Sequence, residues 1–178
     1  MNLKNRRFKV IKSKEMKKII LMMLVVVLAS CTAPQQNPDF EKNVDLAKNY
    51  FATFVTEDID ATAALISDDV EWQGCFYGSP VMNKDEAVEY SKGWHAAMEN
   101  ISYAAENYLP GVDPETGQLN GSVRTYGTWS GTNTASGKDF EILMYHYFTF
   151  NDDGKIINAG DFGDATGLLM AVAPDQSE

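Results

Sequence analysis

One histidine stands in an otherwise apolar pattern at residues 139–151. Alternate residues of a β-strand lie on one face, so His146 shares its face with apolar side chains, namely Phe140, Ile142, Met144, Phe148 and Phe150. An imidazole takes up and releases protons near neutral pH, which makes His146 a candidate for general acid–base catalysis. The same pattern is also typical of a histidine that only packs in a core. Both interpretations are open from the sequence.

Other residues with reactive side chains are few. The chain has two cysteines, Cys31 and Cys75, and its two histidines are not clustered with them in the spacing of a zinc site. Neither local charge nor an identifiable base would activate the Cys75 thiol, so we expect it to pack as a small apolar residue. The sequence therefore predicts no metal site.

The elements expected to position these residues are helices first and strands afterwards. Residue spacing predicts helices over 40–56 and 59–66, a strand over 70–76, and a third helix that begins after Asn83 with Glu86 in a capping box. Further strands are expected at 101–109, 119–130, 139–151 and 155–163, with a turn at 151–154 and a last short helix capped by Asp164. This order predicts an α+β fold with a curled antiparallel sheet.

The N-terminal segment is typical of a secretory signal. Lys17 and Lys18 precede an apolar run of 11 residues, 19–29, which is shorter than the roughly 20 residues of a membrane span. The sequence Leu28-Ala29-Ser30-Cys31 resembles the lipobox of bacterial lipoproteins, in which the cysteine is lipidated and becomes the mature N-terminus. We expect Cys31 to attach the protein to a membrane of the bacterial cell envelope, outside the cytoplasm. An ordinary signal peptide or a membrane anchor is the alternative.

The expected organisation is a signal peptide at 1–30, a flexible tether at 31–39, one domain at 40–172 and a short tail at 173–178. Residues 1–30 hold eight of the 15 Lys and Arg but one of the 25 Asp and Glu, so the remainder carries a net charge of −17. Nucleic-acid binding depends on cationic side chains that neutralise phosphates. We therefore expect no nucleic-acid partner.

Several motifs in order resemble the SnoaL-like proteins of the nuclear transport factor 2-like superfamily. They are a helix with Tyr50, the segment LISDDVEW at 65–72, the strand-turn-strand FTFNDDGKI at 148–156 and the segment DFGD at 161–164. The resemblance implies a cone, in which a strongly bent antiparallel sheet wraps around N-terminal helices and encloses a deep apolar pocket. Members include isomerases, dehydratases, cyclases and modules that only bind ligands, so the fold alone does not select a function.

The resemblance also assigns positions for catalysis. Tyr50 falls where ketosteroid isomerases carry an oxyanion-hole tyrosine, whereas Trp72 takes the place of the base and His146 that of the protonated aspartate. An indole cannot accept a proton, which argues against that isomerase chemistry. A set made of His146, Tyr50 and Asp161 remains for a dehydration or an aldol-type cyclisation, without metal or cofactor.

Two functions without catalysis compete with this set. Binding of a small hydrophobic or amphipathic molecule, which the sequence slightly favours, would use a pocket lined by Trp72, Trp94, Tyr103, Tyr126, Trp129, Met144 and Phe148. Superfamily members also often dimerise through the outer face of the sheet, where Tyr126, Thr128, Tyr145 and Tyr147 are expected.

Overall fold

The computed structural model describes residues 37–175. The expected signal peptide, the lipidation site Cys31 and most of the tether lie outside the described residues, as do the last three residues of the tail. Within the described part, no helix is long and apolar enough to cross a membrane.

Residues 37–175 contain four helices, three of which begin after the capping residues expected from the sequence. Helix α2 spans Phe40–Val55, α3 spans Ile59–Ala64, α4 spans Lys84–Ala97 and α5 spans Ala165–Val172. The side chains of Asp58 and Asp164 accept bonds from backbone N–H groups in the first turns of α3 and α5. Asn83 and Glu86 form the complete capping box that begins α4.

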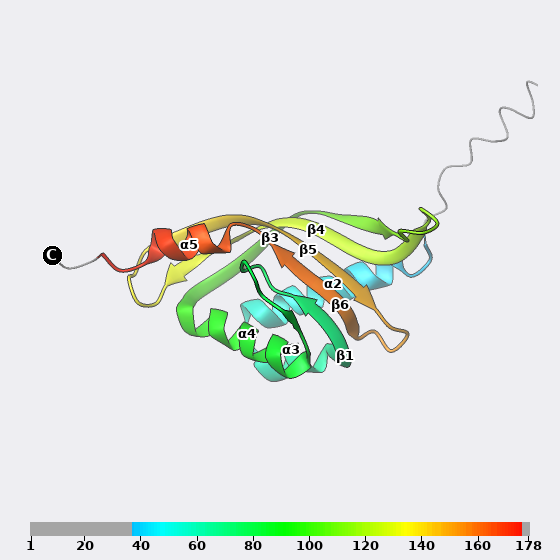
Figure 1. Ribbon diagram of the computed structural model, residues 1–178, viewed down its shortest axis with the longest axis horizontal. Helices are drawn as coiled ribbons and strands as arrows, with labels where there is room; N and C mark the ends of the chain where they lie inside the picture. Colours follow the sequence, from blue (N-terminus) through cyan, green and yellow to red (C-terminus); the bar gives the residue numbers. More distant parts are fainter. Residues whose placement is uncertain (1–36, 176–178) are drawn as a thin grey trace, which may run out of the picture. The chain divides into compact units, whose positions relative to one another are not determined.

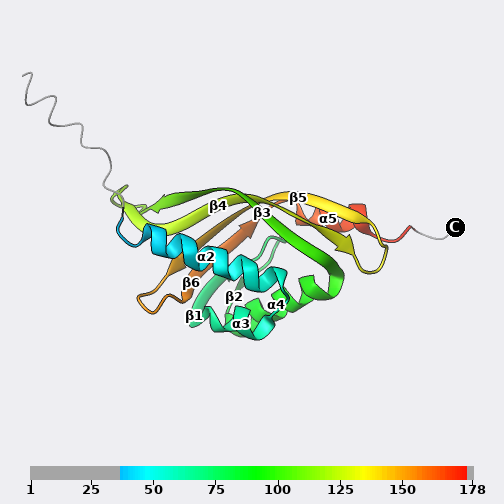
Figure 2. The same cartoon turned by 180° about the vertical axis from the view of Figure 1, so that it is seen from behind.

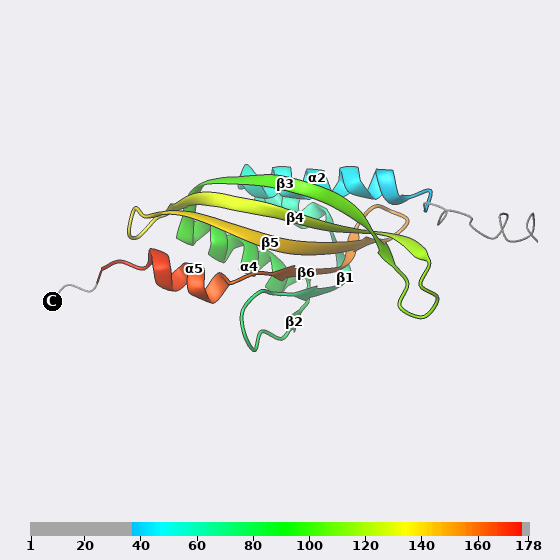
Figure 3. The ribbon, with the colours of Figure 1, turned by 90° about the horizontal axis from the view of Figure 1, so that it is seen from above.

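Six strands form one sheet in the order β2-β1-β6-β5-β4-β3 (Figure 3). Their bounds are Ile66–Gln73 for β1, Val81–Met82 for β2, Met98–Val112 for β3, Leu119–Asn133 for β4, Asp139–Phe150 for β5 and Ile156–Phe162 for β6. Strand β1 begins four residues before the expected strand at 70–76, and β2 was not expected. Strands β3 and β4 run past the expected ends at 109 and 130.

The sheet is mixed, which corrects the expectation of a purely antiparallel sheet. Strands β3, β4, β5 and β6 are antiparallel neighbours, but β1 pairs with β6 in parallel, with Trp72 opposite Ala159. The parallel pair arises because the chain leaves β1 through β2 and α4, crosses to β3, and returns through four strands to the open side of β1. The bent α+β architecture is otherwise as expected from the sequence.

Helices α2, α3 and α4 lie on one face of the bent sheet, and α5 extends from the end of β6 beside β5 (Figures 1 and 2). Between helices and sheet lies the core, whose largest fully buried side chains include Trp72, Phe148, Ile66, Met98 and Ile156. Each such apolar side chain contributes about 1.5–3 kcal/mol on burial. The helices therefore pack against the bent sheet and position the walls of the cavity that lies between the helices and the sheet.

A bulge in β6 sets the register that matters for the site. Thr149 pairs with Asn158 but Phe150 pairs with Ile156, so Ile157 is an extra residue on β6. Beyond the bulge, His146 lies opposite Asp161, whereas continuing the pairing of Phe150 would set it opposite Gly160. A shift of one residue turns every side chain to the other face. The bulge is therefore what brings Asp161 to the face of His146.

Candidate functional site

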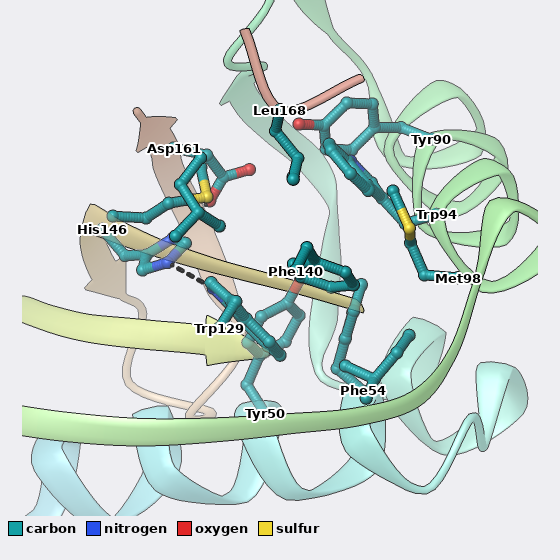
Figure 4. A pocket seen from close by; sticks show the side chains of 13 residues that line it. Tyr50, Phe54, Tyr90, Trp94, Met98, Trp129, Phe140, His146, Asp161 and Leu168 are labelled. Carbon is teal, nitrogen blue, oxygen red and sulfur yellow. Dashed lines mark hydrogen bonds and ion pairs between the residues drawn. The ribbon is translucent and has the colours of Figure 1, made fainter. Parts of the chain in front are cut away.

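A cavity lies between the helices and the concave face of the sheet (Figure 4). Its enclosed volume is about 60 Å³, and the space between its side chains grows to about 580 Å³ when the part that opens to solvent is included. Its lining comes from helices α2, α4 and α5 and from strands β3, β4, β5 and β6, and it comprises Tyr50, Phe54, Tyr90, Trp94, Met98, Ile101, Trp129, Phe140, Ile142, Met144, His146, Asp161 and Leu168. Most of these side chains are apolar or aromatic, as in small-molecule sites generally.

His146 and Asp161 form a buried pair on one side of this cavity. They are cross-strand neighbours on β5 and β6, and Nδ1 of His146 lies 2.7 Å from Oδ1 of Asp161. The two residues are 4% and 7% exposed. Directly opposed side chains on antiparallel strands meet on the same face, so the pairing follows from the register.

Two tryptophans complete the hydrogen bonds of the pair. Trp72 donates its indole N–H to Oδ2 of Asp161 at 3.0 Å, and Trp129 donates its indole N–H to Nε2 of His146 at 2.9 Å. Figure 4 shows the second bond and the side chains around it. Strands β1, β4, β5 and β6 each contribute one of the four residues.

The direction of these bonds fixes the protonation of the imidazole. An indole nitrogen only donates, so Nε2 of His146 accepts and carries no proton. The imidazole proton is therefore on Nδ1 and is donated to Asp161, and His146 is neutral in this arrangement. Asp161 thus accepts the N–H groups of Trp72 and His146 and keeps unused lone pairs. Both imidazole nitrogens of His146 are engaged by protein groups, since Nε2 accepts from Trp129.

Two tyrosines that line the cavity are affected by the charge of this carboxylate. Burial raises the pKa of Tyr50 well above its ordinary value, and the negative charge of Asp161 raises it further, while the hydroxyl of Ser91 opposes the shift. The pKa of Tyr90 is raised by burial and by the same carboxylate. Its hydroxyl lies 2.9 Å from the sulfur of Cys75. Both tyrosines therefore keep their protons at neutral pH and can donate hydrogen bonds.

The structure brings all three residues of the expected acid–base set to one cavity, since Tyr50, His146 and Asp161 line it together. Among the expected pocket residues, Trp94, Trp129 and Met144 also line it. Their catalytic or binding roles stay predictions, because placement alone does not show a function.

The expected positions of four pocket residues need correction. Trp72, 2% exposed, and Phe148, fully buried, lie in the core behind the lining, because Tyr50 packs against both rings at 5.4 and 5.3 Å. The ring of Tyr103 stacks on Phe51 at 4.0 Å, which closes it off from the cavity. Tyr126 lies on the outer face of the sheet, 41% exposed and 5.1 Å from the ring of Tyr145, because its position in β4 points away from the helices.

Several lining residues were missed, although the sequence carries a signal for most of them. Tyr90 and Met98 lie four residues before and after Trp94, which was expected in the pocket, and this step places neighbours on one face of a helix up to its end at Met98. Phe54 is one turn after Tyr50 for the same reason, and Phe140 and Ile142 share the strand face of His146. Leu168 had no such signal, because the placement of α5 depends on the end of β6.

Within residues 37–175 we find no group of three or more His, Cys, Asp or Glu residues that could hold a metal ion. The imidazole of His95 contacts the backbone oxygen of Phe54 at 3.0 Å, away from the pair of His146 and Asp161. The polar chemistry described for this cavity is thus that of one carboxylate, one neutral imidazole and tyrosine hydroxyls.

The sequence profile of the SnoaL-like domain matches residues 47–159, which is most of the chain. The chain belongs to the SnoaL-like family. The matched segment begins in α2 and ends in β6, so it includes Tyr50, Trp72, Trp129 and His146 and stops two residues before Asp161. No curated protein matches this family member significantly.

Solved structures share the fold of this SnoaL-like protein at low sequence identity. A provisionally assigned SnoaL-like polyketide cyclase from Jannaschia sp. CCS1 is 15% identical with a TM-score of 0.64, over 79% of this chain and 97% of its own. A provisionally assigned isomerase from Bacillus subtilis is 16% identical with a TM-score of 0.64, over 79% of this chain and 100% of its own. A nuclear transport factor 2-like protein from Burkholderia thailandensis E264 is 22% identical with a TM-score of 0.57, over 74% and 98%. At these identities the likeness establishes the fold.

Proposed function

We propose that this SnoaL-like domain binds a small hydrophobic or amphipathic molecule in the cavity between α2, α4 and the sheet. The observation that carries the proposal is the composition of the cavity wall. Aromatic and aliphatic side chains surround a few polar groups, namely Asp161, His146 and the hydroxyls of Tyr50 and Tyr90. Such a wall removes apolar ligand surface from water while the polar groups fix its orientation.

The test uses the neutral apolar dye N-phenyl-1-naphthylamine, whose fluorescence rises in apolar surroundings. We expect one dye molecule to bind per chain. Leu168→Trp fills the cavity from α5 and should weaken dye binding at least about tenfold, which is 1.4 kcal/mol. Leu169→Trp is the matched control, because Leu169 is 37% exposed and does not line the cavity. Equal dye binding by both variants would contradict the proposal.

A second candidate function is supported by the geometry of Asp161. Its carboxylate faces the cavity with unused lone pairs, and it is held by His146 and Trp72. In this function, Asp161 takes a proton from the carbon next to a carbonyl group of the ligand and returns it to another atom of the same molecule. The hydroxyl of Tyr50 donates a hydrogen bond to the oxygen on which negative charge develops. Isomerisation or cyclisation of this kind consumes no cofactor.

The expectation that His146 itself acts as the acid or base changes within this second function. Its Nε2 accepts from Trp129 and its Nδ1 donates to Asp161, so neither nitrogen is offered to a ligand. We assign His146 the positioning of the Asp161 carboxylate instead. A general base must reach the proton that it removes, which Asp161 does from the cavity wall.

Exchange of ligand hydrogen for deuterium tests this function separately from binding. A cyclic ketone such as cyclohexanone is incubated with the protein in D₂O, and deuterium next to the carbonyl is followed by NMR. Asp161→Asn should remove any exchange above the buffer rate. Asp153→Asn, in the exposed turn between β5 and β6, should retain it. Exchange at the buffer rate with the unaltered protein counts against catalysis and leaves the binding proposal standing.

The proposal also includes attachment to a membrane through lipid on Cys31. The lipobox-like sequence and the short apolar run before it support this part. Dimerisation through the outer sheet face stays a prediction, although Tyr126, Tyr145, Tyr147 and Phe162 do form a connected group of rings there.

A further inference from the structure

Asp161 is the one formally charged side chain among the described residues that line the cavity. His146, its partner, is neutral, because Nε2 accepts the N–H of Trp129. Trp72 is likewise a neutral donor. The lining includes no lysine and no arginine. The carboxylate is thus hydrogen-bonded on both oxygens but its charge is not balanced by a cation of the lining.

A buried charge that lacks a counter-ion destabilises the protein, because hydrogen bonds from neutral donors replace only part of its hydration. The negative charge of Asp161 acts on its surroundings, since it raises the pKa of Tyr50 and of Tyr90. A cation that entered the cavity would interact favourably with this carboxylate across a region of low dielectric constant. Figure 4 shows the carboxylate of Asp161 directed toward the space beside Leu168 and Phe140.

The opposite walls of the cavity are aromatic. Trp94 and Tyr90 face it from α4, Phe54 and Tyr50 from α2, and Trp129 and Phe140 from the sheet. The face of an aromatic ring attracts a cation by about 0.5–1 kcal/mol when exposed and about 2 or more when desolvated. The net charge of the chain also favours a cationic ligand, since 24 acidic and seven basic residues follow residue 30.

We propose that the ligand of this cavity carries a cationic nitrogen on an apolar body, as an alkylamine or a quaternary ammonium compound does. The nitrogen is expected near the carboxylate of Asp161, with its apolar substituents against the aromatic walls of α2 and α4. This inference rests on the proposed binding function and names its ligand class. Anionic ligands are disfavoured by the same carboxylate, whereas neutral apolar ligands would gain burial alone.

Benzyltrimethylammonium and neopentylbenzene test the inference, because they have the same shape and differ in the charge of one central atom. Binding to the full-length protein is measured by the fluorescence of its own tryptophans, two of which line the cavity. We expect the cation to bind at least about tenfold more tightly than its neutral isostere. Phenylacetate, an anion of similar size, should bind more weakly than both.

Asp161→Asn and Asp153→Asn separate the cavity charge from the net charge of the protein. Asp161→Asn should bring the two affinities to within about threefold of each other, mainly by lowering the affinity for the cation. Asp153→Asn removes one charge from an exposed turn and should leave the ratio unchanged. A thermal unfolding curve shows whether Asp161→Asn is folded. If that variant does not fold, the ratio of the two affinities measured on the unaltered protein still decides the inference.

The outcomes distinguish the inference from the binding proposal on which it rests. Tight binding of neopentylbenzene with equal or weaker binding of the cation overturns the inference and supports a neutral ligand in the same cavity. Failure of both ligands, and of the naphthylamine dye, overturns the binding proposal together with the inference. A preference for the cation that is undiminished in Asp161→Asn also overturns it, because the preference would then not depend on the charge of Asp161.

Discussion

The indole N–H of Trp129 meets Nε2 of His146 at 2.9 Å, and this bond decides which imidazole nitrogen carries the proton. The proton must lie on Nδ1, from which it is donated to Asp161. His146 was expected from the sequence to be an acid or base, but both of its ring nitrogens are engaged in hydrogen bonds with protein side chains. The group that faces the cavity with free acceptor capacity is the carboxylate of Asp161.

Trp129→Phe tests this arrangement. In the unaltered protein, ¹⁵N NMR should show His146 with a protonated Nδ1 and an unprotonated Nε2. The variant leaves the buried Nε2 without its donor, so the free energy of unfolding should fall by about 1–3 kcal/mol in addition to the loss of packing. Trp94→Phe is the control, because Trp94 lines the same cavity without a bond to His146. A protonated Nε2 in the unaltered protein would contradict the assignment.

Trp72 and Asp161 should be energetically coupled. Trp72→Phe removes a donor from the buried carboxylate, and Asp161→Asn presents an amide N–H₂ to one of the two N–H groups that the carboxylate accepts. Each change should lower the free energy of unfolding by about 1–3 kcal/mol. The double variant should lose less free energy of unfolding than the two single variants lose together, by about 0.5–3 kcal/mol. Urea unfolding of the four proteins measures this coupling, and strict additivity would show that the bond contributes nothing.

Much of the fold was predictable because its signals are local. Asn83 and Glu86 define the start of α4 through bonds within one turn, and the sequence alone shows them. The alternation in β5 placed His146 on the buried face for the same reason. The parallel pairing of β1 with β6 was not predictable in this way, since it depends on where the last strand returns.

The site depends on relations between strands that the sequence does not show. Asp161 reaches His146 because Ile157 is bulged out of β6, and no residue type there identifies the bulge. Trp72 and Trp129 were recognised as aromatic residues of a pocket, but their N–H groups point to acceptors on other strands. Tyr126 was misplaced because a tyrosine suits both faces of a half-buried strand, with an apolar ring and a polar hydroxyl.

Cys31→Ala should release the protein from membranes. A lipidated Cys31 would hold the chain by several acyl chains, each buried methylene adding about 0.8 kcal/mol, and the variant has no thiol to accept them. Fractionation of cells expressing the unaltered protein, Cys31→Ala and Cys75→Ala measures the effect. Cys75→Ala, which alters the other cysteine, should stay with the membrane. A Cys31→Ala protein that sediments wholly with membranes would make the lipoprotein interpretation wrong.

The Cys75 thiol should react slowly at neutral pH. Burial raises its pKa from 9.0 to about 11, and the charge of Asp161 adds to the rise, although the hydroxyl of Tyr90 opposes it. The thiolate is the reactive form, so alkylation by iodoacetamide should accelerate up to about pH 11 in the folded protein. In urea the acceleration should level off near the ordinary pKa. The Cys31→Ala protein is used, because Cys75 is then its sole thiol.

The same shift gives a pH dependence of stability with a defined sign. The unfolded chain loses the Cys75 proton first as the pH rises, so the free energy of unfolding is unaffected by this group below pH 9.0 and decreases between there and about pH 11. Cys75→Ala removes this part of the decrease, and comparing urea unfolding of the two proteins over that range isolates it. Tyr90→Phe should raise the pKa of the thiol further, since it removes the hydroxyl 2.9 Å from the sulfur. A folded thiol that titrates near 9.0 would show that Cys75 is open to water rather than buried.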